Sequence, residues 1–244
     1  MFQANTTPSF KEPFVDKQRQ FDKQLEELKK KLVRMAALAE TMIDKTINEL
    51  VSRDERLAEK VPQYEEELNR LQIEIDDAAL TLLATQQPVA TDLRFIVAAT
   101  KINGELERIG DLVINITENV HILAQQPELK PLIDIPRMAD LARKMVRDSI
   151  DAFLRGDPLL AQSVIMTDDQ VDDLKDQVLR ELLTYMMADP KAIQRAIALI
   201  LISRHLERIG DHATNIAEDV IYMTQGRDVR HPRTPKERPP DLDV

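Results

Sequence analysis

The sequence has no cysteine and no tryptophan, only 4% aromatic residues, and five glycines among 244 residues. Without cysteine, the chain can form no disulfides and offers no thiolate metal ligand or cysteine nucleophile. It also lacks a Gly-rich phosphate loop, a His-Glu-x-x-His motif and a Gly-x-Ser-x-Gly motif. The four histidines show no metal-ligand spacing with one another. The common signatures of nucleotide hydrolases, zinc proteases and serine hydrolases are therefore absent.

The chain is acidic, with 33 basic and 43 acidic residues and a formal net charge of −10. It has no basic patch interleaved with aromatics, so nucleic acid and anionic lipid are not expected as partners. The longest apolar run, 196–202, is far shorter than the roughly 18 residues needed to span a bilayer. The N-terminus lacks the apolar core of a signal peptide. These features predict a cytoplasmic protein.

The composition is dominated by strong helix formers, which predicts an all-α protein. Apolar residues recur at spacings of three and four, and proline or glycine interrupts the pattern at intervals. The predicted helices span about 15–52, 56–87, 91–124, 136–155, 158–188 and 191–226.

The order is three helices, a link marked by Pro127, Pro131 and Pro136, and three more helices. Short turns between long helices require antiparallel neighbours, so the predicted fold is two tandem, pseudo-symmetric three-helix bundles. The bundles are predicted at 15–126 and 131–226. Residues 1–14 are predicted to be disordered, and 227–244 to form a Pro-rich tail with no core to join.

One segment occurs twice, one hundred residues apart: Leu-Glu-Arg-Ile-Gly-Asp stands at 106–111 and again at 206–211. The likeness continues for about ten residues. Its shared polar positions have helical spacing and form one stripe on each helix, beside a second stripe of apolar residues. The polar stripe consists of Glu107, Asp111, Asn115 and Glu118 in the first copy and Glu207, Asp211, Asn215 and Glu218 in the second.

The polar stripe offers the ligands of a hard metal ion. Glu107 and Asp111 lie one turn apart and repel by roughly 0.2–0.5 kcal/mol on an exposed helix. A cation that bridges the two carboxylates turns this repulsion into a net attraction. Carboxylate and amide oxygens suit Mg²⁺, Mn²⁺ or Ca²⁺, with iron possible and zinc less suitable. Gly110 and Gly210 each cost about 1 kcal/mol relative to alanine in mid-helix, which predicts a closely packed neighbour at both. All eight stripe residues are candidate metal ligands.

The alternative interpretation is a solvated acidic edge. In it, Arg108 pairs with Asp111 and Arg208 pairs with Asp211, three positions apart, and such exposed pairs contribute little. The retention of the whole stripe in both copies favours binding over this interpretation.

Further acids lie on the helices before each repeat. Asp169 and Asp172 could face the repeat of the second half and complete a metal site, with Glu66 and Asn69 at the matching turn of the first half. They also fit ordinary surface charges. A carboxylate-bridged metal enzyme in a helical bundle would be expected to show Glu-x-x-His on paired helices, which is absent, so an enzyme is not expected.

Three features together resemble the PhoU family, the accessory proteins of the bacterial high-affinity phosphate transport system. They are the doubled Glu-Arg-Ile-Gly-Asp, Gln87-Pro88 followed by Asp92-Leu-Arg94, and the segment 183–187 before Asp189. The resemblance extends from about residue 20 to His231. It implies two symmetric three-helix bundles and metal clusters at Glu/Asp-x-x-x-Asp motifs, which match 107–111 and 207–211 here.

The resemblance also implies a role: a negative regulator of the phosphate-starvation response that links the ATPase subunit of the phosphate ABC transporter to a phosphate-sensing histidine kinase. It implies a homodimer that reaches the membrane only through its partners. The oxygen ligands of the stripe favour Mg, Mn or Fe as the metal over Zn. One departure is that Asn69 stands opposite Asp172, so the first-half site is expected to be weaker or differently filled.

Overall fold

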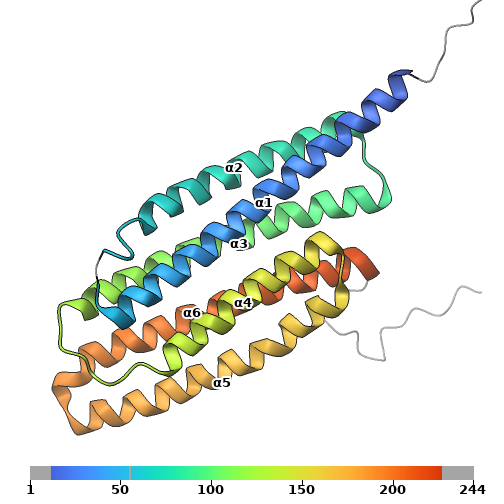
Figure 1. The fold of residues 1–244 in the computed structure, drawn as a ribbon. Coiled ribbons are helices and arrows are strands. Elements are labelled where there is room, and N and C mark those ends of the chain that lie inside the picture. Colours follow the sequence, from blue (N-terminus) through green and yellow to red (C-terminus); the bar gives the residue numbers. More distant parts are fainter. Residues whose placement is uncertain (1–11, 55, 227–244) are drawn as a thin grey trace, which may run out of the picture.

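In a computed structural model of the chain, which describes residues 12–54 and 56–226, six α-helices and one short 3-10 helix follow one another. They are α1 (Glu12–Ser52), α2 (Val61–Gln86), α3 (Ala90–Ala124), α4 (Asp134–Arg155), α5 (Pro158–Ala188), η1 (Pro190–Ala192) and α6 (Ile193–Gln225). No strand occurs within these ranges. The predicted all-α class, with two three-helix bundles, is confirmed (Figure 1). The predictions for residues 1–11 and for the tail at 227–244 lie outside the described residues.

The first residue after the first helix of each half has a left-handed backbone conformation. Gly156 ends α4 with a φ of 62°, and Asp157 then caps α5 by accepting two backbone N–H groups at 2.9 and 3.1 Å. After α1, Arg53 adopts the same left-handed region with a φ of 58°. Its guanidinium donates to two carbonyls at the C-terminal end of α3, at 3.1 and 2.9 Å. Different residues therefore end the two helices in the same way, although the connection to the next helix is longer in the first half.

Two helix starts differ from the predictions. α2 begins at Val61 rather than near residue 56, because the preceding segment is held as a turn: the N–H of Ala58 donates to the Glu49 carboxylate at 3.0 Å. Pro62 then occupies the first turn of α2, where proline is tolerated. α1 begins at Glu12, so the segment 1–14, predicted to be disordered, overlaps its first turn; Pro13 is acceptable there for the same reason.

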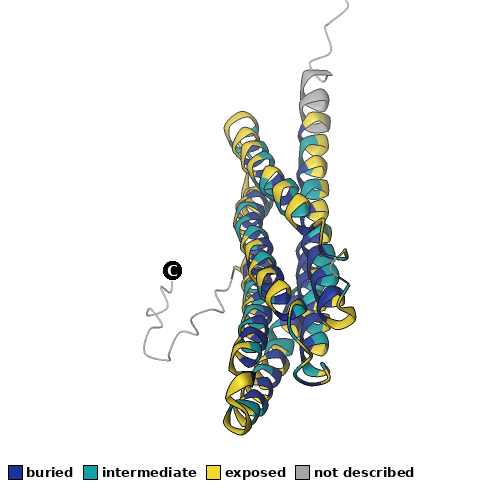
Figure 2. Cartoon of the chain, turned by 90° about the vertical axis from the view of Figure 1, so that its left-hand side faces the viewer, coloured by how far each residue is buried: buried dark blue, intermediate teal, exposed yellow. Residues whose placement is uncertain are grey.

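Within each half the three helices contact one another, and the halves meet through α3 against α6 and α1 against α4 (Figure 1). In the described ranges α2 and α5 do not touch, and they lie at opposite edges of the molecule. The buried positions form one continuous hydrophobic cluster that includes residues of all six helices (Figure 2). The apolar stripe of each repeat is its centre: Leu106 and Leu206 are fully buried. None of the described helices is both long and apolar enough to cross a membrane.

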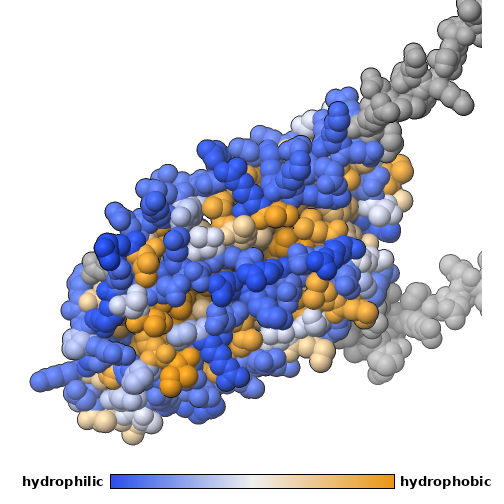
Figure 3. Space-filling model, viewed as in Figure 1, coloured by the Kyte–Doolittle hydropathy of each residue, from blue (hydrophilic) through white to orange (hydrophobic). Residues whose placement is uncertain are grey.

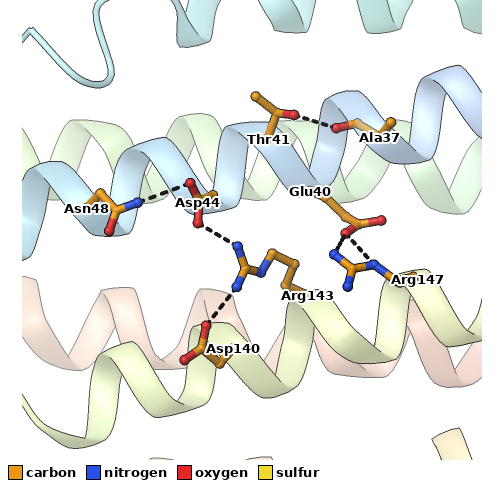
Figure 4. Close-up of polar contacts among 8 residues, drawn as sticks. All are labelled: Ala37, Glu40, Thr41, Asp44, Asn48, Asp140, Arg143 and Arg147. Atoms are coloured by element: carbon orange, nitrogen blue, oxygen red, sulfur yellow. Dashed lines mark hydrogen bonds and ion pairs between the residues drawn. The ribbon is translucent and has the colours of Figure 1, made fainter.

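The contact between α1 and α4 carries ion pairs on its solvent side. Arg143 on α4 contacts Asp44 on α1 and donates to Asp140 on its own helix at 3.0 Å, while Arg147 donates to Glu40 at 2.9 Å (Figure 4). The surface on this side is mostly hydrophilic, with hydrophobic patches between the helices (Figure 3). Exposed pairs of this kind contribute at most about 1 kcal/mol each. The buried apolar residues therefore supply most of the attraction between the halves.

Replacing Leu106 with alanine should lower the free energy of unfolding by about 2–5 kcal/mol, because the side chain is fully buried and the cavity cannot collapse completely. Urea titration followed by circular dichroism measures the change. Leu80→Ala on α2 is the matched control, since Leu80 is 63% exposed and its loss should change stability by less than about 0.5 kcal/mol. Equal losses in the two variants would contradict the placement of the core.

Candidate metal centre

The second helix of each half can be aligned by its buried positions. Val61, Leu68, Leu71 and Ile75 of α2 recur 103 residues later as Val164, Val171, Leu174 and Val178 of α5. The same offset matches Glu65 with Asp168 and Asn69 with Asp172. Glu65 and Asn69 are four residues apart on α2, as Asp168 and Asp172 are on α5. Each of these two pairs therefore lies on one side of its helix.

In the second half, the acids of α5 and α6 are close enough to influence one another. We call Asp168, Asp172, Glu207 and Asp211 the second-half cluster. Burial, followed by the carboxylates of Asp211 and Asp172, raises the pKa of Asp168 to about 6. Burial and then Glu207 likewise raise the pKa of Asp211 above its ordinary value. Four carboxylates from two helices thus crowd one another, and the burial of Asp168 and Asp211 adds to the cost of their negative charge.

A lysine lies among these acids. Lys175 on α5 places its Nζ 2.9 Å from Asp172 Oδ1 and 3.0 Å from Glu207 Oε1, which joins α5 to α6. The hydrogen bond to Asp172 is the main reason that the pKa of Lys175 is raised, and the bond to Glu207 adds to it. The ammonium therefore remains charged and neutralises part of the second-half cluster.

In the first half, the corresponding group is Glu65, Asn69, Glu107 and Asp111, which we call the first-half cluster. Burial and then the Asp111 carboxylate raise the pKa of Glu107, and Glu65 contributes in the same direction. The Asn69 amide donates to Glu65, while its buried Oδ1 has no hydrogen-bond partner among the described residues. A buried oxygen without a donor is costly and suits a cation ligand.

The two mid-helix glycines do have close neighbours, as predicted. A Cβ added at Gly210 would lie 3.2 Å from Asp168 Oδ1, so the missing side chain leaves room for a carboxylate of the second-half cluster. A Cβ at Gly110 would lie 3.2 Å from a methyl group of Leu68. The neighbours differ because the two halves diverge at this point: one glycine accommodates a cluster residue and the other accommodates the core.

Several predicted site residues lie elsewhere. Asn215 donates to Glu105 on α3 at 3.1 Å, and His212 Nδ1 lies 2.6 Å from the same oxygen, so both belong to the contact between the halves. Burial raises the pKa of Glu105, but these two hydrogen bonds and the charges of His212 and Arg108 together lower it below its ordinary value. Arg108 pairs with Glu105 at 3.1 Å, rather than with Asp111 as the solvated-edge interpretation predicted.

The structure also leaves the far end of each polar stripe apart from the clusters. Glu118 is exposed and Glu218 is half-buried, each seven residues beyond its aspartate and therefore about 10 Å further along the helix axis. Asn115 and Asp169 are exposed as well.

Three residues with a place in the clusters were not singled out from the sequence: Glu65, Asp168 and Lys175. For two of them a signal existed. Asp168 and Asp172 repeat the four-residue spacing of Glu207 and Asp211, and Glu65 stands four before Asn69. Lys175 belongs to the second-half cluster only through contacts between helices, which no spacing along the chain reveals.

The residues present fit a hard metal ion. The donors are carboxylate and amide oxygens, the carboxylates crowd against one another, and the Asn69 oxygen has no donor among the described residues. Within those residues, however, no three histidine, aspartate or glutamate side chains already converge in a way that could hold a metal ion. A bound ion would therefore have to draw the carboxylates together. Its positive charge would offset the net negative charge of each cluster.

Asp168→Asn should stabilise the metal-free protein above about pH 6. The native pKa of Asp168 exceeds its ordinary value of 3.8, so the folded state holds this proton more tightly than the unfolded state. Stability is therefore lost as Asp168 ionises between about pH 4 and pH 6, and asparagine avoids that loss. After allowance for solvent screening, the gain should be on the order of 1 kcal/mol.

Urea titrations with a chelator across this pH range test the prediction. The advantage of Asp168→Asn should disappear near pH 4, and the exposed neighbour variant Asp169→Asn should show no comparable gain. A gain that does not depend on pH would show that the ionisation of Asp168 is not its cause.

Comparison with known proteins agrees with this architecture. The family model described as "PhoU domain" matches the chain twice, at residues 32–120 and 135–220, once in each half. The crystal structure of PhoU from Pseudomonas aeruginosa superposes with a TM-score of 0.81 at 38% identity, covering 85% of this chain and all of that one. The phosphate transport system regulatory protein PhoU from Streptococcus pneumoniae gives 0.77 at 28% identity, covering 86% of this chain and 99% of that one.

Sequence relatives are similar over nearly their full length. A phosphate-specific transport system accessory protein PhoU homolog of Pseudomonas putida is 41% identical over 214 residues, which cover 87% of this chain and 84% of the relative. The homolog of Aquifex aeolicus is 42% identical over 209 residues, with coverage of 86% and 95%. With a family match in each half and this identity over most of both partners, the chain belongs to the PhoU family.

Proposed function

We propose that this chain is a non-enzymatic, cytoplasmic regulator of phosphate uptake that acts by contact with other proteins. It represses the phosphate-starvation response by linking the ATPase subunit of the phosphate ABC transporter to a phosphate-sensing histidine kinase. It approaches the membrane only through these partners. The observation that carries the proposal is the PhoU match in each half, together with an acidic cluster at corresponding places in both.

The names of the relatives support a regulatory role. Those of Pseudomonas putida and Aquifex aeolicus are called accessory proteins of the phosphate-specific transport system, and that of Streptococcus pneumoniae a regulatory protein. The clusters support a role for metal: each presents hard oxygen ligands on the outer flank of a bundle. In the proposal these clusters hold Mg, Mn or Fe rather than Zn, and the loaded surfaces dock on the transporter and the kinase.

A deletion strain tests the regulatory role. Cells that lack the chain should express starvation genes in phosphate-rich medium, and the wild-type chain should restore repression. The transporter ATPase subunit and the kinase should co-purify with the wild-type chain. A normal phosphate response in the deletion strain, or the absence of both partners from the purified complex, would contradict the proposal.

Metal content tests the role of the clusters. After stripping by chelator and reloading with Mg, Mn or Fe, the wild-type protein should retain bound ions in elemental analysis, and Asp111→Ala/Asp211→Ala should lose most of them. The control is Glu118→Ala, because Glu118 belongs to the same stripe but lies about 10 Å along the axis from Asp111. Unchanged metal content in the double variant would show that the clusters are not metal centres.

The proposal includes a homodimer, as the family resemblance implies. Exposed apolar residues at matching places on α3 and α6, Val97 and Ile197, offer surface for such contact. Sedimentation equilibrium measures the mass directly, and a monomer of 27.9 kDa at micromolar concentration would contradict this part of the proposal.

A further inference from the structure

A cation that belongs to the protein already occupies part of the second-half cluster. The Lys175 ammonium lies within 3.0 Å of carboxylate oxygens on two helices, Asp172 on α5 and Glu207 on α6. Its side chain is 25% exposed, so these contacts are partly shielded from water. Two of the four carboxylates in the cluster are thus held by the lysine.

Among the described residues, no lysine or arginine forms an ion pair with Glu65, Glu107 or Asp111; Arg108 pairs with Glu105 and only lowers the pKa of Glu107 from a distance. The offset of 103 residues that aligns α2 with α5 places Gln72 where the second half has Lys175. The same alignment places the neutral Asn69 opposite Asp172. The first-half cluster therefore has three carboxylates and no lysine of its own, whereas the second-half cluster has four carboxylates and one ammonium.

We infer that Lys175 is a tethered cation that competes with a metal ion for the second-half cluster and lowers its affinity for metal. This inference rests on the proposed function, because it takes the clusters to be metal centres. An incoming ion must share or displace the ammonium at Asp172 and Glu207 before these oxygens can become ligands. The flexible four-carbon stem of lysine allows the ammonium to move away.

Lys175 also bridges the two helices that a metal ion in this cluster would have to bridge. The ammonium occupies the position between Asp172 and Glu207 that an ion bridging α5 and α6 would need, and it holds these two groups around itself. Metal binding in this half therefore exchanges one bridge between the helices for another. In the first half, an ion instead adds a bridge where the lysine is missing.

The test isolates each cluster in turn. In a Glu107→Gln/Asp111→Asn background, which disables the first-half cluster, Mn²⁺ is titrated and the free ion is followed by electron paramagnetic resonance. Lys175→Gln should bind Mn²⁺ roughly tenfold more tightly than the background alone, because a unit charge beside a divalent ion is removed. Lys175→Arg keeps the charge and should bind about as weakly as the background. Far-UV circular dichroism confirms that each variant is folded.

The reciprocal variant guards against a folding defect at position 175. In a Glu207→Gln/Asp211→Asn background, Gln72→Lys should weaken Mn²⁺ binding to the first-half cluster by a similar factor. If Mn²⁺ binds with equal affinity whether or not residue 175 is charged, the inference about Lys175 is wrong, but the proposed metal centres are not contradicted. Equal tightening by glutamine and arginine would also overturn the inference. If none of the proteins, including the unmodified chain, binds Mn²⁺ saturably, the proposed metal centres are also wrong.

Discussion

The packing of α3 against α6 is the contact on which the rest of the molecule depends. Both helices pass through the middle of the structure and bury the same apolar stripe, with Leu106 and Leu206 fully enclosed. Because a helix repeats every 3.6 residues, each can present its acids on the flank next to that stripe. Those flanks face α2 in one half and α5 in the other. The contact that joins the halves thus also determines where the two acidic clusters lie.

The helices could be predicted closely from the sequence, because their ends depend on local chemistry. Gly156 ends α4, Asp157 caps α5, and Pro158 is the first residue of α5. Gln87, before Pro88, leaves the right-handed helical region with a φ of 49° and so ends α2. The start of α2 could not be found in this way, since it depends on the Glu49 carboxylate from another helix. Periodicity predicts where a helix can form, but tertiary contacts decide where it begins.

The composition of the site was less predictable. Spacing along one helix identified Glu107, Asp111, Glu207 and Asp211 as neighbours, and the structure places them beside α2 and α5. It could not show that the Asn215 side chain bonds across to Glu105, because that depends on the register between two halves separated by a hundred residues. The pseudo-symmetry is also broken there: His205 stands where the second repeat should have the counterpart of Glu105. The buried Nδ1 of His205 has no hydrogen-bond partner among the described residues, so the second repeat offers no matching acid to the contact.

The two clusters carry the same formal charge although their residues on α2 and α5 differ. Counting Asp168, Asp172, Glu207 and Asp211 together with Lys175 gives a formal charge of −3, and Glu65, Glu107 and Asp111 give the same value. Asp172 in the second half corresponds to Asn69 in the first, and Lys175 corresponds to Gln72. With one acid and one base fewer, the first-half cluster keeps the formal charge of the second-half cluster, so a bound cation meets the same net charge in both.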